Sequence, residues 1–187
     1  MSDALLQPRE SKAVRPTRGF SLIELLVVVA IILIIAAIAI PNLLNARIAA
    51  NEASAAQIVR TVTTAAMTYS STYGNGFPPD LASLGGPAGG AASCAQAILM
   101  DSVITSAPNQ KSGFTFGYTA VGPPVNPSPA GCAAPGSNAY LVTATPNTEF
   151  VTGIRSFCSD EPGTIHYDTT GATASSQGAC EALPALQ

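Results

Sequence analysis

The sequence predicts an α+β fold, in which one long N-terminal helix packs on a small antiparallel sheet of about four strands. Residues 20–73 contain no glycine and only one proline, and such a run favours a single helix of roughly 80 Å at 1.5 Å per residue. Strand signals follow only from residue 113 onwards. The second half of the helix carries an apolar stripe that such a sheet would bury.

The first half of the expected helix is long and apolar enough to cross a bilayer. Residues 25–46 carry no charge over 22 residues, within the range needed to span roughly 30 Å of hydrocarbon. We therefore expect residues 20–46 to form a transmembrane half. The positive-inside rule places the N-terminus in the cytoplasm, because four basic residues precede the segment: Arg9, Lys12, Arg15 and Arg18. A plain signal anchor is the alternative interpretation.

The second half of the helix, residues 47–73, is amphipathic. We expect it to pack one face on the globular part of the chain, residues 74–187. The apolar stripe recurs at helical spacing: Ile48, Ala55, Ile58, Val62 and Tyr69. The polar residues lie mostly away from this stripe: Arg60, Thr61, Thr64 and Thr68.

Two residues mark breaks in the helix. Pro41 lacks a backbone N–H and clashes with the preceding turn, so we expect a kink or local melting near residues 37–41. Gly74 lies just past the last helical turn and prolines follow it, which is typical of a helix end.

The segment between the helix and the sheet, residues 74–110, carries two weaker signals. Asp80–Leu84 suits one capped turn. Ser93 and Gln96 have the spacing of a capping box, which predicts a short helix through about Ile104.

Four segments carry strand signals. Phe114, Phe116 and Tyr118 alternate with less bulky residues, which predicts a half-buried strand. The last two strands are expected to form a hairpin, because residues 161–164 suit a type II turn. The three strands expected after the first are Ala139–Thr145, Ile154–Cys158 and Thr164–Tyr167.

One carboxylate, Glu24, lies near the start of the apolar segment. An ionised side chain costs about 2.5–3.5 kcal/mol at mid-membrane and less towards the edge, so it needs a partner or a functional reason. Residues 19–32, GFSLIELLVVVAII, and residues 39–41, AIP, closely resemble the start of type IV prepilins and type II secretion pseudopilins. The resemblance implies the pilin fold and a bacterial inner-membrane precursor.

In that family a prepilin peptidase cleaves after the glycine and methylates the new N-terminus. The resemblance therefore implies a leader of residues 1–19, cleavage between Gly19 and Phe20, and N-methylation of Phe20. Glu24 matches the family's glutamate, and Pro41 matches its helix-loosening proline. The new cation at Phe20 can pair with Glu24 of a neighbouring subunit in a low dielectric, so that Glu24 sets the register of assembly. Snorkelling of Glu24 to the headgroups is the alternative role.

Four cysteines follow the apolar segment, where the compartment should be oxidising. The chain has no CxxC spacing and a single histidine, so a zinc site is not expected. Two disulfides are expected instead, out of three possible connectivities. We predict the pairs Cys94–Cys132 and Cys158–Cys180.

No catalytic residue, cofactor or metal is predicted. His166 and Asp168 lie two apart on one strand face, and the chain has no Gly-x-Ser-x-Gly elbow. A calcium site at Asp160, Glu161 and Asp168 is a weaker interpretation of carboxylates that are usually just solvated. Beyond Gly19, four basic residues oppose nine carboxylates, which argues against nucleic acid as the main partner.

The leading hypothesis is a structural subunit of a type IV pilus. The resemblance implies as partners the prepilin peptidase, other copies of the chain in a helical fibre, an inner-membrane assembly platform with its ATPase, and membrane lipid before assembly. The assembled protein would lie on the cell surface. It would lie in the periplasm if the chain is a type II secretion pseudopilin, which is the alternative. A membrane-anchored enzyme or binding module is the rival from another class.

Overall fold

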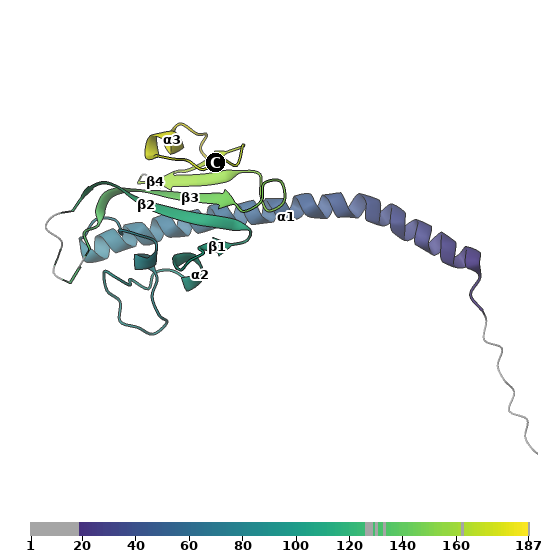
Figure 1. Cartoon of the computed structure of the whole chain (residues 1–187), viewed down its shortest axis with the longest axis horizontal. Coiled ribbons are helices and arrows are strands. Elements are labelled where there is room, and N and C mark those ends of the chain that lie inside the picture. Colours follow the sequence, from purple (N-terminus) through teal and green to yellow (C-terminus); the bar gives the residue numbers. More distant parts are fainter. Residues whose placement is uncertain (1–18, 126–128, 130, 133, 162, 187) are drawn as a thin grey trace, which may run out of the picture. The chain divides into compact units, whose positions relative to one another are not determined.

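The chain divides into two compact units, Met1–Pro41 and Asn42–Gln187. Helix α1, Leu22–Tyr73, belongs to both (Figure 1). Apart from Gly19, the expected leader lies outside the described residues. The computed structural model describes residues 19–125, 129, 131–132, 134–161 and 163–186.

The predicted long helix is confirmed, since α1 has 52 residues. Gly74 ends it as expected: its φ of 61° is a left-handed conformation that costs glycine little, and its N–H donates to the Ser70 carbonyl at 3.0 Å. The backbone stays helical through Pro41. Local melting near residues 37–41 is therefore wrong, and the kink at Pro41 stays a prediction.

Within residues 42–73, one face of α1 packs under the sheet (Figure 1). The predicted apolar stripe is wrong at one residue. Ile58 is only half-buried, and its neighbour Val59 is the residue that lies at the centre of the buried face. Both residues lie within one turn of Val62, so spacing alone does not decide between them. The predicted polar positions are all exposed. The fully buried line is Ala55, Val59, Val62, Ala66 and Tyr69.

The sheet has five strands that pair in sequence order, each pair antiparallel. Alternate residues of the central strands face α1 and join its buried side chains in one core; Phe114, Tyr140 and Phe157 are among them. The strands are β1 Gln110–Lys111, β2 Phe114–Pro124, β3 Ser137–Pro146, β4 Ser156–Asp160 and β5 Ile165–Asp168.

The additional strand, β1, corrects the prediction of about four. Lys111 pairs with Phe114 across a two-residue loop, Ser112 and Gly113, whose φ angles are 52° and 76°. Two residues of positive φ are typical of a tight hairpin turn. A two-residue strand is too short to show alternation, which is why the sequence pattern missed it.

The expected hairpin between β4 and β5 is present, but the hydrogen bond of its turn joins residues 160 and 163, one residue earlier than the predicted turn at residues 161–164. Gly163 has a φ of 77°, and its N–H donates to the Asp160 carbonyl at 2.8 Å. Pro162, the second residue of the predicted type II turn, lies outside the described residues.

The capped turn expected at Asp80–Leu84 is present as the short 3-10 helix η1, Ala82–Leu84. The Asp80 carboxylate accepts the backbone N–H of Ser83 at 2.8 Å and its hydroxyl at 2.6 Å. This cap fixes the chain shortly after α1 ends.

The helix predicted from the capping box of Ser93 and Gln96 is wrong. These residues instead exchange backbone hydrogen bonds with each other in a tight turn. The N–H groups of Leu99 and Met100 then donate to the Leu84 carbonyl, so the segment pairs with η1 and does not continue as a helix. The short helix nearby, α2, is Ser102–Thr105 and begins later, with Asp101 as its N-cap.

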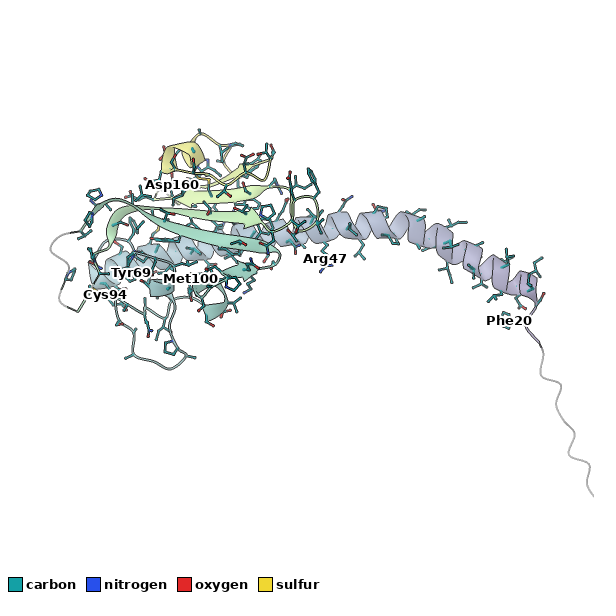
Figure 2. All side chains as sticks on the ribbon, viewed as in Figure 1. Phe20, Arg47, Tyr69, Cys94, Met100 and Asp160 are labelled. Atoms are coloured by element: carbon teal, nitrogen blue, oxygen red, sulfur yellow. A yellow bond between two sulfur atoms is a disulfide. The ribbon has the colours of Figure 1, made fainter. Side chains whose placement is uncertain are left out.

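Two disulfides join Cys94 to Cys132 and Cys158 to Cys180, the pairing predicted from the sequence; their Cα atoms lie 5.2 and 6.0 Å apart. The first holds the segment that contacts Tyr69, whose hydroxyl donates to the Cys94 carbonyl at 2.9 Å (Figure 2).

The second disulfide fastens the C-terminal segment, including α3 (Gln177–Glu181), onto the sheet face opposite α1. The same segment covers the β5 edge: the Tyr167 N–H donates to the Pro184 carbonyl at 3.0 Å, and the Leu186 N–H to that of Ile165 at 2.7 Å. A paired edge is protected from joining another sheet.

Candidate functional site

The candidate site is the start of α1, residues 19–24. Gly19 and Phe20 precede the first helical residue, Leu22, and Phe20 is 76% exposed (Figure 2). A Cβ atom placed on Gly19 would meet no other atom within 4 Å. The peptide bond between Gly19 and Phe20 therefore lies outside the helix, and no described side chain packs against Gly19.

Glu24 lies in the first turn of α1. The Ser21 carbonyl accepts the N–H of Glu24 at 3.1 Å and that of Leu25 at 3.2 Å, which starts the helix. The Glu24 side chain is exposed, and its carboxylate has no hydrogen bond or ion pair with the rest of the described chain. In hydrocarbon such a group needs a partner from another molecule.

The apolar part of α1 suits a membrane by length and composition. An 18-residue stretch has a mean hydropathy of 3.3, and none of it is buried within the chain. Over the described ranges, α1 is the one helix with this character. An uncovered apolar surface of this size is typical of a segment that contacts lipid or another protein.

A second carboxylate on α1, Glu52, joins the helix to the sheet. Glu52 is only 4% exposed. Its Oε1 accepts the N–H groups of Ile154 at 2.8 Å and Arg155 at 3.0 Å, and its Oε2 lies 2.8 Å from both Nε and Nη2 of Arg155. We call these three residues the Glu52 latch. Because the latch takes both N–H groups, β4 begins at Ser156, two residues later than predicted.

The Glu52 latch holds an ionised carboxylate. Burial alone raises the pKa of Glu52, but hydrogen bonds from the backbone of Arg155 and Ile154 and from the Arg155 guanidinium outweigh burial, so the pKa falls below its ordinary value. The guanidinium also lies over the rings of Phe157 and Tyr167, 5.8 and 5.5 Å from their centroids. These contacts fix its geometry.

The start of the chain is similar to known proteins. The prokaryotic N-terminal methylation motif matches residues 14–40. Over 38 residues the chain is 63% identical to the N-terminus of the type IV wide pilus major component PilA4 of Thermus thermophilus. The start of the chain is therefore similar to the N-terminal segment of a type IV pilin.

The match to PilA4 covers 20% of this chain and 29% of the relative, so the chain spans less than a third of that protein's length. No solved structure matches the chain.

Residues considered for other sites hold the sheet domain together. His166 Nδ1 lies 2.7 Å from the Leu183 carbonyl. The Asp168 carboxylate accepts the N–H and hydroxyl of Thr170, and these hydrogen bonds lower the pKa of Asp168.

Asp160 and Asp168, two of the carboxylates considered for a calcium site, lie at opposite ends of β4. Asp168 pairs with Ser156 at the start of β4, whereas Asp160 is the last residue of that strand. In the part of the chain that the structure describes, no group of three or more potential metal ligands comes together.

The sequence analysis missed Glu52. The signal was present, because Glu52 lies four residues after Ile48 and three before Ala55 on the apolar stripe. A charge on the buried face of a helix needs a partner. The partner, Arg155, is 103 residues away in sequence, and no local pattern connects the two.

Proposed function

We propose that the chain is a structural subunit of a type IV pilus, which polymerises through α1 after cleavage between Gly19 and Phe20. The observation that carries the proposal is the methylation motif over residues 14–40, at the head of a helix whose apolar surface is uncovered. The relative that shares this segment is the major component of a pilus, which favours a pilus over a secretion pseudopilus.

Cleavage would change the charge at the head of the helix. It removes the basic leader and leaves an α-amino cation on Phe20, four residues before Glu24. Opposite charges attract far more strongly in hydrocarbon than in water. An incoming subunit whose cation meets Glu24 of its neighbour is stabilised at one stagger, and a subunit at another stagger is not.

Assembly needs no catalytic residue in this chain. The apolar surface of α1 leaves lipid and packs against the same surface of other copies in the fibre core. A prepilin peptidase supplies the cleavage and methylation, and an inner-membrane platform with its ATPase supplies the energy. The precursor lies in the inner membrane with its N-terminus in the cytoplasm.

The mature protein from the native host is expected to begin with N-methylated Phe20. Intact-mass measurement of the purified chain should show loss of residues 1–19 and the gain of one methyl group. A host that lacks the prepilin peptidase is the control and should yield the unprocessed chain. Retention of Met1 in a host with an active peptidase would contradict the proposal.

A strain without this chain is expected to lose its long surface filaments and to keep its secreted enzymes. Electron microscopy of the cells and activity assays of the culture medium measure the two outcomes. The reverse result, normal filaments with enzymes retained in the periplasm, would identify a secretion pseudopilin instead.

A further inference from the structure

The loop between β3 and β4, residues 147–155, exposes apolar side chains that the fold does not use. Phe150 is 64% exposed, Val151 58% and Ile154 37%. We call this segment the tip loop. It holds half of the large hydrophobic residues that are exposed beyond position 50 of the described chain; the others are Met67, Leu99 and Val103.

The backbone of the tip loop is fixed by its own hydrogen bonds in a conformation that exposes these side chains. Phe150 has a φ of 61°, which is unusual and strained for a bulky residue, and its N–H donates to the Gly153 carbonyl at 3.0 Å. The Thr152 N–H donates to the Thr148 carbonyl at 2.9 Å. A strained backbone that exposes an aromatic ring suggests a use for that ring.

The tip loop is tied to α1 within two helical turns of the end of the charge-free run at residue 46. The Glu52 latch holds its last residues, and Asn51 Nδ2 donates to the Thr152 carbonyl at 3.0 Å. Leu44 is 51% exposed and contributes to the same hollow as Val151. This hollow is lined by Leu44, Arg47, Asn51, Ser112, Gly113, Val151 and Thr152.

Residue 46 is the last of the 22 uncharged residues, so Val151 lies beside the turn of α1 that leaves the hydrocarbon. The turn between β1 and β2 contacts the first residue of the tip loop, because the Asn147 N–H donates to the Gly113 carbonyl at 2.9 Å. A Cβ atom on Gly113 would come within 2.7 Å of Thr152.

The basic residues of the domain gather at the same end. Only four basic residues follow Gly19, and three of them are near the tip loop. Arg47 lines its hollow (Figure 2), Lys111 directly precedes Ser112 of the hollow, and Arg155 ends the loop. Glu149, the acidic residue of the loop, has its side chain beside Gly171. Aromatic and basic side chains together are typical of surfaces that meet lipid headgroups.

We propose that the tip loop docks on the membrane surface, with Phe150 and Val151 among the headgroups and upper acyl chains and with Arg47 and Lys111 on lipid phosphates. The loop then holds the domain of an unassembled subunit against the bilayer. This inference rests on the proposed function, because it requires α1 to span the membrane.

Single tryptophans test the depth of the loop, since the chain contains no tryptophan of its own. The full chain is placed in vesicles of phosphatidylcholine and phosphatidylglycerol with brominated acyl chains, at about one protein per thousand lipids so that copies rarely meet. The variants are Phe150→Trp in the tip loop, Ile34→Trp in the span, and Met67→Trp as the control. Met67 is also exposed and apolar but lies about 30 Å further along α1 than residue 46.

We expect bromine to quench Ile34→Trp strongly and Phe150→Trp at least about twofold more than Met67→Trp, with a blue-shifted spectrum for Phe150→Trp. In the Phe150→Trp background, Arg47→Gln with Lys111→Gln should reduce this quenching, and the reduction should be smaller in vesicles of brominated phosphatidylcholine alone, which carry no net charge. Equal quenching of Phe150→Trp and Met67→Trp, with Ile34→Trp quenched, would overturn the docking but leave the membrane span intact.

Two further outcomes are distinct. Absence of quenching in Ile34→Trp would refute the membrane-spanning helix, and with it the proposed function. A blue shift of Phe150→Trp that grows with protein density, without bromine quenching, would show that a second copy of the chain covers the loop and would overturn the lipid assignment.

Discussion

Replacing Glu24 by alanine should leave membrane insertion unchanged and reduce fibre yield by about tenfold or more. Alanine is as compatible with hydrocarbon as the rest of the segment, so the helix still inserts. The incoming Phe20 cation then loses the one carboxylate in the apolar part of α1, and no other side chain there replaces it in a low dielectric. Resistance of the chain to carbonate extraction measures insertion, and the mass of sheared fibres measures assembly.

Two matched variants separate charge from packing. Glu24→Asp keeps the carboxylate on a shorter side chain and should retain part of the yield. Leu25→Ala truncates the neighbouring exposed residue without a change of charge and should assemble nearly normally. Normal fibre yield from Glu24→Ala would refute the register role, and an equal loss from Leu25→Ala would assign the effect to helix packing.

Replacing Glu52 by alanine is expected to lower the free energy of unfolding by about 2–4 kcal/mol, because two backbone N–H groups and one guanidinium lose a charged acceptor. Urea unfolding of the detergent-solubilised chain, followed by near-ultraviolet circular dichroism with disulfides intact, measures the change. Glu181→Ala removes an exposed carboxylate from α3 and is the control, with an expected effect within about 0.5 kcal/mol.

The Glu52 latch also predicts a dependence on pH. The pKa of Glu52 is lower in the folded chain than in the unfolded chain, so its contribution is fully present above the unfolded value of about 4.3. That contribution is lost as the pH falls through the lower folded value. The difference in unfolding free energy between wild type and Glu52→Gln should therefore shrink below about pH 5. A difference that stays constant with pH would show that the charge of Glu52 does not stabilise the fold.

The elements that the sequence predicted well are those with long or repeated local patterns. The glycine-free run located α1, and the alternation of Phe114, Phe116 and Tyr118 located β2. A short pattern was less reliable. The spacing of Ser93 and Gln96 fits a tight turn as well as the capping box of a helix. The turn forms because the chain that follows it donates backbone N–H groups to the Leu84 carbonyl.

The start of the chain and the sheet domain differ in how far their candidate functional residues can be predicted from the sequence. The roles that we propose for residues 19–24 depend on local features, a bond before the helix and a carboxylate at a fixed spacing, and such features can be read from the sequence alone. Glu52 and the tip loop acquire their roles from contacts across about 100 residues, and only the structure joins them.

The sequence by itself therefore determined the long apolar helix, the lone Glu24 within its apolar part and the approximate positions of the main strands, because each depends on neighbouring residues. Only the tertiary structure decided that Val59 and not Ile58 lies at the centre of the buried face of α1, where β4 begins and which apolar side chains remain exposed. Those outcomes depend on hydrogen bonds and packing between segments that are distant in the chain, and a buried carboxylate such as Glu52 is stable only where the fold brings it its partners.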